Sequence, residues 1–163
     1  MTGDDVLEIL DVLRGAGAEV WIGGGWGIDA LVGRQTREHQ DLDLMHRLEQ
    51  EPLVVAALAE TGFAETLDWR PVRFVVADAA GRRIDLHPLV FGSGGGALQE
   101  SLEPGKPFAY PADCFVTGSV EGRTVPCLSA GQQVFFHQGY EPRARDLHDM
   151  ARLREAFGIR THF

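Results

Sequence analysis

The chain of 163 residues lacks several features that mark specialised classes of protein. It has only two cysteines, Cys114 and Cys127, which are too few for a disulfide framework. No export signal is apparent, because the N-terminal MTGDDVLEIL is acidic and leads directly into an amphipathic pattern. We therefore expect reduced thiols and a cytoplasmic protein. No apolar run is long enough to span a bilayer, so we expect no membrane partner.

An excess of positive charge is also missing. The formal net charge is −9, whereas a protein that holds DNA or RNA by its phosphates needs a basic surface. We therefore expect no nucleic-acid partner. The same negative charge is compatible with a small cationic substrate.

Internal repeats and low-complexity tails are absent as well. The length favours one domain over residues 1–163, with a core over about 1–110 and a C-terminal hairpin and helices over about 111–163. A hydrophobic content of 44% with 24% charged residues is ordinary for a globular protein that buries a core without disulfides or metal.

Apolar spacing and turn residues predict an α/β (α+β) fold, with a small mixed sheet flanked by helices. Val6, Ile9, Leu10 and Leu13 follow helical spacing, and Gly15 to Gly17 ends that helix. Further helices are expected over Trp26–Leu31 and Glu51–Glu60. Strands are expected over Ala18–Ile22, Asp41–Met45, Phe63–Thr66, Val72–Ala77 and Arg82–Leu86.

The C-terminal half begins with a segment rich in glycine and proline, Pro88–Pro111. It lacks the Lys-Ser/Thr ending of a P-loop, and its composition predicts a mobile surface loop or lid. A hairpin is expected next, over Phe115–Val120 and Arg123–Leu128, and then a helix that Ser129 and Gln132 cap. A last helix is expected from Pro142, with an apolar stripe that belongs to the core: Leu147, Met150, Leu153 and Phe157.

Residues 22–44, IGGGWGIDALVGRQTREHQDLDL, hold the most informative pattern. Gly24 and Gly25 open a short helix, where unpaired backbone N–H groups and the helix dipole attract phosphate. Asp41 and Asp43 follow on a strand, and because strand side chains alternate, both carboxylates point to one face of the sheet. Like charges held side by side need a cation, and Mg²⁺ prefers oxygen ligands. The segment predicts one site for metal and phosphate.

A third carboxylate comes from the segment Arg83-Ile84-Asp85-Leu86-His87. Alternation puts Asp85 and His87 on one face, so Asp85 repeats the geometry of Asp41 and Asp43 on a neighbouring strand. Three carboxylates from two strands suffice for two metal ions about 3.5–4 Å apart, as in two-metal phosphoryl transfer. His87 fits either a partner of the metal ligands or a packed histidine, and a carboxylate with an imidazole would also suit Zn²⁺ or Mn²⁺.

These residues also have simpler interpretations that involve no metal or nucleotide. Asp41 and Asp43 could be solvated charges on an edge strand, and Gly24 and Gly25 could serve only a tight turn. Asp85 could be the structural partner of one of its neighbours, Arg82 or Arg83.

The remaining candidates are weaker. Arg37 and His39 lie beside the acidic pair and could contact a triphosphate, or could belong to a solvated loop with Arg34 and Glu38. Trp26 is expected in the core rather than under a nucleobase. The residues that we expect to line an acceptor pocket are Trp69, Arg70, Arg73, His137 and Tyr140.

Four segments together, GGWGID, TREHQDLDL, DWRPVR and DLHP, resemble the DNA polymerase β-like nucleotidyltransferases. The resemblance is to the antibiotic-modifying branch, which contains lincosamide and aminoglycoside 2''-nucleotidyltransferases, and it runs over nearly the whole chain. It implies the polymerase β-like fold. Residue by residue, it implies that Gly24 and Gly25 bind nucleotide phosphates, that Asp41 and Asp43 are the metal-binding pair, and that Asp85 is the third acidic residue.

The function that follows is Mg²⁺-dependent transfer of a nucleoside monophosphate to a hydroxyl of a small molecule, with release of pyrophosphate. AMP from ATP is the expected donor, and a lincosamide antibiotic is the first acceptor that the resemblance implies. An aminoglycoside acceptor, a protein acceptor as in an antitoxin-type enzyme, and a non-catalytic nucleotide-binding module are the alternatives. The sequence leaves homodimer formation open.

Overall fold

The computed structural model describes all residues, 1–163. Its helices are α1 (Gly3–Gly15), α2 (Gly24–Val32), α3 (Glu51–Glu60), α4 (Ala130–Phe136) and α5 (Ala144–Phe157). Its strands are β1 (Val20–Ile22), β2 (Leu42–Arg47), β3 (Ala64–Trp69), β4 (Arg73–Ala77), β5 (Arg83–Phe91), β6 (Ala97–Gln99), β7 (Phe108–Tyr110), β8 (Phe115–Val120) and β9 (Arg123–Leu128). Two single 3₁₀ turns, η1 (Leu48–Gln50) and η2 (Ala112–Cys114), complete the chain.

The strands form one mixed sheet in the order β3-β4-β5-β2-β1-β9-β8, and β6 and β7 extend it from β5. Two neighbouring pairs are parallel, β2 with β5 and β1 with β9, while the others are antiparallel. The sheet has nine strands and is therefore larger than the sequence indicated. The C-terminal hairpin of β8 and β9 belongs to it, because β9 pairs with β1.

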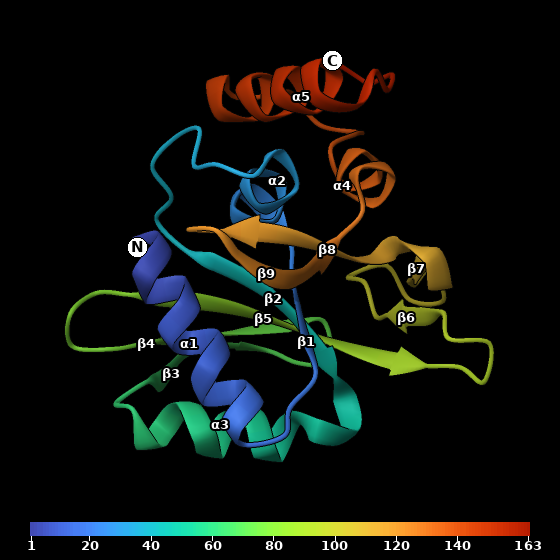
Figure 1. Cartoon of the computed structure of the whole chain (residues 1–163). Helices are drawn as coiled ribbons and strands as arrows, with labels where there is room; N and C mark the ends of the chain where they lie inside the picture. The colour runs from blue at the N-terminus through green and yellow to red at the C-terminus, as the bar shows by residue number, and fades with distance from the viewer.

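Helices cover both faces of the sheet. Figure 1 shows α1 and α3 on one side, and α2, α4 and α5 stacked on the other. The largest apolar cluster joins α1 and α3 to the inner strands, and a smaller one joins Ile28 of α2, Val134 of α4, and Met150 and Leu153 of α5. The inner strands β2 and β5 therefore lie between two packed layers of helices.

Most predicted elements are confirmed, with shifted ends. The helix over residues 51–60 and both hairpin strands have the expected bounds, and Thr2 caps α1, whose four periodic residues are buried. β2 begins at Leu42, one residue later than expected, and β5 continues to Phe91, five residues further than expected. The alternation of side chains in the sequence identifies the two faces of a strand. The length of the strand, however, depends on the neighbouring strands with which it pairs.

The expectation of a mobile loop or lid over Pro88–Pro111 was wrong. The segment contains the end of β5 and two further strands, β6 and β7, which pair in register as Val90↔Leu98 and Leu98↔Ala109. The glycine run forms the turn between β5 and β6, with Gly92 N–H bonded to the Gly96 carbonyl at 2.9 Å and Gly95 at a φ of 80°. Glycine supplies the turn that this short hairpin needs, so the composition marked a turn rather than a loop.

The apolar stripe of the last helix is only half buried. Met150 and Leu153 are fully buried, but Leu147 is 47% exposed and Phe157 is 45% exposed. Because α5 packs outside α2 and α4, only its middle turns are covered (Figure 1). The prediction that all four residues lie in the core was therefore wrong for the two outer ones.

Both cysteines are free and buried. Burial raises the pKa of the Cys114 and Cys127 thiols to about 12, so both stay protonated and unreactive. This agrees with the expectation of reduced thiols. None of the helices combines the length and the apolar character that a membrane crossing requires.

The two leucines of α5 provide a matched test of this packing. Leu153→Ala should lower the free energy of unfolding by about 2–5 kcal/mol, because it leaves a cavity among Ile28, Val134 and Met150. Leu147→Ala, the same substitution on the exposed part of the same helix, should change it by less than about 0.5 kcal/mol. Urea unfolding measures both. Equal losses would show that α5 packs differently.

Candidate active site

The parallel pairing of β2 with β5 brings two carboxylates together. The strands pair as Leu42↔Ile84, Asp43↔Asp85 and Leu44↔Leu86. The four apolar residues are fully buried on one face, so Asp43 and Asp85 emerge directly opposite each other on the other face. The alternation in the sequence indicated this arrangement, and the register confirms it.

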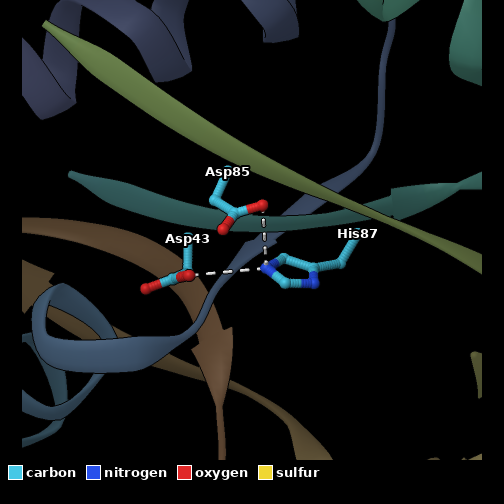
Figure 2. A group of neighbouring side chains, drawn as sticks. All are labelled: Asp43, Asp85 and His87. Atoms are coloured by element: carbon cyan, nitrogen blue, oxygen red, sulfur yellow. Dashed lines mark hydrogen bonds and ion pairs between the residues drawn. The ribbon is translucent and has the colours of Figure 1, made fainter. Parts of the chain in front are cut away.

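His87 joins the two carboxylates to form a cluster whose ligand atoms all lie within 4.8 Å of one another. Figure 2 shows the three side chains pointing toward one another, with His87 Nε2 3.4 Å from Asp43 Oδ1 and 3.7 Å from Asp85 Oδ1. Asp41, which we expected to share the metal site, does not belong to this cluster. It precedes the first residue of β2, and it lies on the wall of the adjoining cavity. The sheet therefore positions Asp43 and Asp85, but not Asp41.

Asp85 has an unusual environment. Arg73 of β4 donates a hydrogen bond to its Oδ2, whereas its buried Oδ1 has no hydrogen-bond partner. Burial raises the pKa of Asp85, and the charge of Asp43 adds to this, although His87 and Arg73 oppose it. A buried carboxylate oxygen without a partner is costly, and a bound cation would satisfy it.

The partners that the sequence suggested for Asp85 were wrong. Arg82 bonds instead to Asp78 and to Glu8 of α1, on a different part of the surface. The actual partner, Arg73, lies on the neighbouring antiparallel strand, which is why sequence proximity did not identify it.

The glycine turn packs directly against the acidic pair. Gly23 N–H bonds to the Asp43 carbonyl at 2.9 Å, and Gly23 caps α2 without a side-chain hydrogen bond. Gly24 has a φ of 53°, and a β-carbon there would overlap Asp43 Oδ2. A β-carbon at Gly25 would overlap the Arg37 guanidinium and the His39 ring. Only glycine fits both positions, so the first N–H groups of α2 stay accessible beside the carboxylates.

Arg37 and His39 are held in place by two buried carboxylates. Asp149 of α5 accepts two hydrogen bonds from the Arg37 guanidinium, at 2.8 and 2.6 Å. Asp29 of α2 lies 2.5 Å from His39 Nε2, and the His39 ring packs at a tilt against buried Trp26, with the ring centroids 4.7 Å apart. The segment between α2 and β2 is therefore anchored at this point, and Trp26 lies in the core as expected.

Asp29 also receives two hydrogen bonds from Thr36, one from its N–H at 3.0 Å and one from its hydroxyl at 2.6 Å. Burial by itself would raise the pKa of Asp29, but the bonds from His39 and Thr36 outweigh it and lower the pKa. Sequence reasoning named neither Asp29 nor Asp149. A charged residue inside an apolar helical pattern was the available signal for Asp29, whereas Asp149 lies in a helix with many charged residues and gave no such signal.

Two adjoining cavities meet at the acidic pair. One has a volume of about 500 Å³ and no hydrophobic lining residue, and its walls carry Gly24, Gly25, Arg37, His39, Asp41, Asp43 and Asp85. The other, of about 280 Å³, is largely apolar and is lined by Met45, Val72, Phe108, Tyr110, Leu128 and Phe136 among others. Gly24, Asp43, Arg73 and His137 line both cavities. The geometry thus offers a polar and an apolar compartment that meet at Asp43, with Asp85 on the polar side.

Only some of the residues that we expected in an acceptor pocket line a cavity. Arg73 and His137 line both cavities, while Trp69, Arg70 and Tyr140 line neither. Trp69 stacks on Arg73 at 4.7 Å, Tyr140 packs on Phe163, and Arg70 binds Glu51 and Glu65.

Residues 5–153 match the family model of aminoglycoside-2''-adenylyltransferase. The chain belongs to this family. Family members are nucleotidyltransferases, so the enzyme class and the resemblance inferred from the sequence are confirmed. A lincosamide resistance protein of Staphylococcus haemolyticus is 29% identical over 94% of this chain and 95% of its own length. A 2''-aminoglycoside nucleotidyltransferase of Klebsiella pneumoniae is 31% identical over 76% of this chain, which spans 66% of that relative.

Solved structures agree with this family member's fold. The lincomycin-bound crystal structure of the lincosamide antibiotic adenylyltransferase LnuA superimposes with a TM-score of 0.87 at 29% identity, covering 96% of this chain and 98% of that one. The solution structure of ANT(2'')-Ia has a TM-score of 0.75 at 21% identity over 94% of this chain and 82% of that one, and so shows the shared fold. The predicted mixed α/β nucleotidyltransferase fold is confirmed.

Gly25→Ala tests the glycine turn. The new β-carbon should displace Arg37 and His39, which Asp149 and Asp29 hold in place, and should weaken nucleotide binding by about tenfold or more, the equivalent of one charge-assisted hydrogen bond. Gly15→Ala, where a β-carbon meets nothing within 4 Å, is the control. Calorimetric titration with a non-hydrolysable nucleotide measures both. If Gly25→Ala bound the nucleotide as tightly as the parent, Gly24 and Gly25 would serve only to form a tight turn.

Asp29→Asn should cost stability in a pH-dependent way. Because the folded-state pKa of Asp29 lies below the unfolded value of about 3.9, its stabilisation is complete above that value and is lost as pH falls through the folded pKa. Chemical unfolding at about pH 7 should show a loss of about 1–3 kcal/mol, which shrinks toward pH 3. Exposed Asp113→Asn is the control. A loss that is the same at both pH values would contradict the ionised, hydrogen-bonded state.

Proposed function

We propose that this family member transfers a nucleoside monophosphate, AMP from ATP, to a hydroxyl of a small antibiotic and releases pyrophosphate. The observation that carries the proposal is the position of Asp43 at the junction of a polar and an apolar cavity, with Asp85 paired directly beside it on the wall of the polar cavity. One compartment suits a triphosphate and the other a partly apolar acceptor. Family membership supports the reaction class.

The donor set fits divalent metal. Asp43 and Asp85 present carboxylate oxygens within 4.8 Å of each other, and Asp85 Oδ1 is buried without a partner. Mg²⁺ is the cation that such oxygens and a triphosphate favour, and Asp43 and Asp85 would hold it, with Asp41 on the adjoining wall as the third carboxylate. Bound Mg²⁺ would neutralise negative charge on the phosphoryl oxygens. We keep the expectation of two ions, which three carboxylates suffice to hold in two-metal phosphoryl transfer.

The chain's own residues then position the phosphates. The N–H groups at the start of α2 face the polar cavity, and the dipole of this helix favours negative charge there. Arg37 and His39 line the same cavity next to Gly25, and Asp149 and Asp29 fix their orientation. This rigid arrangement reduces the cost of orienting a triphosphate beside the carboxylates.

In the reaction the acceptor hydroxyl oxygen attacks the α-phosphorus, a new P–O bond forms, and the bond from the α-phosphorus to the bridging oxygen of pyrophosphate breaks. Asp85 accepts the hydroxyl proton. Its raised pKa makes it a better base than an exposed aspartate, and its Oδ1 has no competing hydrogen bond. Arg73 holds its other oxygen and so fixes the direction of Oδ1.

A lincosamide is the acceptor that we favour. The lincosamide relatives match this chain over nearly their whole length, and the smaller cavity offers Phe108, Tyr110 and Phe136 to an apolar group. The free buried thiols suit a reducing compartment, so we place the reaction in the cytoplasm.

An aminoglycoside is the second candidate, because six carboxylates line the polar cavity and would attract a polycation: Glu38, Asp41, Asp43, Asp85, Asp146 and Asp149. An assay of pyrophosphate release distinguishes a lincosamide acceptor from an aminoglycoside acceptor. It combines each of four nucleotides, ATP, GTP, CTP and UTP, with each of four antibiotics, lincomycin, clindamycin, tobramycin and kanamycin. We expect release with ATP and a lincosamide. Release only with aminoglycosides would favour the second candidate, and none with any pair would contradict antibiotic transfer.

Asp85→Asn tests the chemistry. It keeps the shape of the side chain but removes the proton acceptor and one metal-binding charge, so pyrophosphate release should fall by about 10²–10⁴-fold. The melting temperature should not decrease, because repulsion with Asp43 is relieved. Asp113→Asn, on the exposed 3₁₀ turn η2, is the matched control. Undiminished release from folded Asp85→Asn would contradict the mechanism.

A further inference from the structure

Behind His87 lies a line of buried polar groups that the reaction described above does not use. Tyr110 of β7 is 2% exposed and Gln99 of β6 is 5% exposed, and both also line the apolar cavity. Tyr110 Oη lies 2.5 Å from Gln99 Oε1, and Gln99 Nε2 lies 3.0 Å from His87 Nδ1. Buried polar groups in an apolar setting persist when they are fully hydrogen-bonded and serve a purpose.

The backbone fixes the direction of every bond in this line. Gln99 Nε2 also lies 3.0 Å from the carbonyl oxygen of Val72, which can only accept. The amide nitrogen must therefore face Val72, and the amide oxygen must face Tyr110. Burial raises the pKa of Tyr110, so its hydroxyl stays protonated and donates to Gln99 Oε1. A flipped Gln99 would place two oxygens against each other.

The same logic extends to the imidazole. Gln99 Nε2 carries two hydrogens, one for the Val72 carbonyl and one for His87 Nδ1. His87 Nδ1 therefore accepts, and the ring proton resides on Nε2. That nitrogen faces Asp43 Oδ1 at 3.4 Å and Asp85 Oδ1 at 3.7 Å (Figure 2). A nitrogen that carries a proton cannot ligate a metal.

We propose that Tyr110 and Gln99 are positioning residues that hold His87 in its Nε2–H tautomer, so that His87 donates to Asp43 and faces Asp85 with its proton instead of ligating metal. His87 thus offsets the repulsion between the two carboxylates and orients their oxygens. The line begins in the segment of β6 and β7, which also lines the apolar cavity. The tautomer of His87 does not depend on the proposed function. The effect on kcat does rest on the proposed function.

Nitrogen NMR of the ¹⁵N-histidine-labelled protein tests the tautomer directly. The His87 signals are assigned by their loss in His87→Gln, and spectra are recorded at about pH 8, above the usual histidine pKa of about 6.5. We expect the parent to carry its proton on Nε2, and Gln99→Met and Tyr110→Phe to gain the Nδ1–H form. Gln132→Met, which removes another buried glutamine that bonds to the Ala109 carbonyl, is the control and should leave His87 unchanged.

Kinetics provide the second measurement. Gln99→Met should lower kcat by about 10- to 100-fold, as loss of a residue that orients a metal-site side chain does, while the KM for ATP and the Mg²⁺ requirement stay unchanged. A raised Mg²⁺ requirement in His87→Gln would instead identify His87 as a ligand.

An Nδ1–H or doubly protonated His87 in the parent would overturn the proposal, as would a tautomer unaffected by Gln99→Met. A parent without pyrophosphate release would contradict the proposed function alone, because the NMR result would still decide the tautomer.

Discussion

Asp43 and Asp85 repel each other across a directly paired position of two parallel strands, and much of the site is arranged to offset that repulsion. Arg73 neutralises one oxygen of Asp85, and His87 faces the other. The buried leucines and isoleucine on the opposite face fix the register, so the carboxylates cannot move apart without breaking the sheet. What stays unsatisfied is one buried oxygen, which defines where a cation is needed.

Each side of the acidic pair is supported by a different part of the chain. On the polar side, α2 supplies the glycine turn, and α5 supplies Asp149 to hold Arg37. On the apolar side, β6 and β7 supply Gln99 and Tyr110, and α4 contributes Phe136. The C-terminal helices and the added strands therefore do more than cover the core. They place side chains that line the polar and the apolar cavity.

The sequence predicted the parts of the fold and site that depend on local pattern. Alternation assigned the faces of Asp43 and Asp85, and the glycine pair marked the start of α2 correctly. Asp41 was predicted inside the strand but precedes β2, because strand ends depend on pairing with neighbours, and β6 and β7 were missed because glycine content hides a tight hairpin. Arg73, Asp149 and Gln99 act through partners that lie 12 to 112 positions away in the chain, which no local pattern reveals.

The most direct test of the account is the position of the metal. Crystals grown with Mn²⁺, a non-hydrolysable ATP analogue and no acceptor should show an anomalous peak bound by oxygens of Asp43 and Asp85 beside the N-terminus of α2, with no ligand from His87. A peak ligated by His87 Nε2, or a nucleotide bound without metal between these two carboxylates, would contradict it.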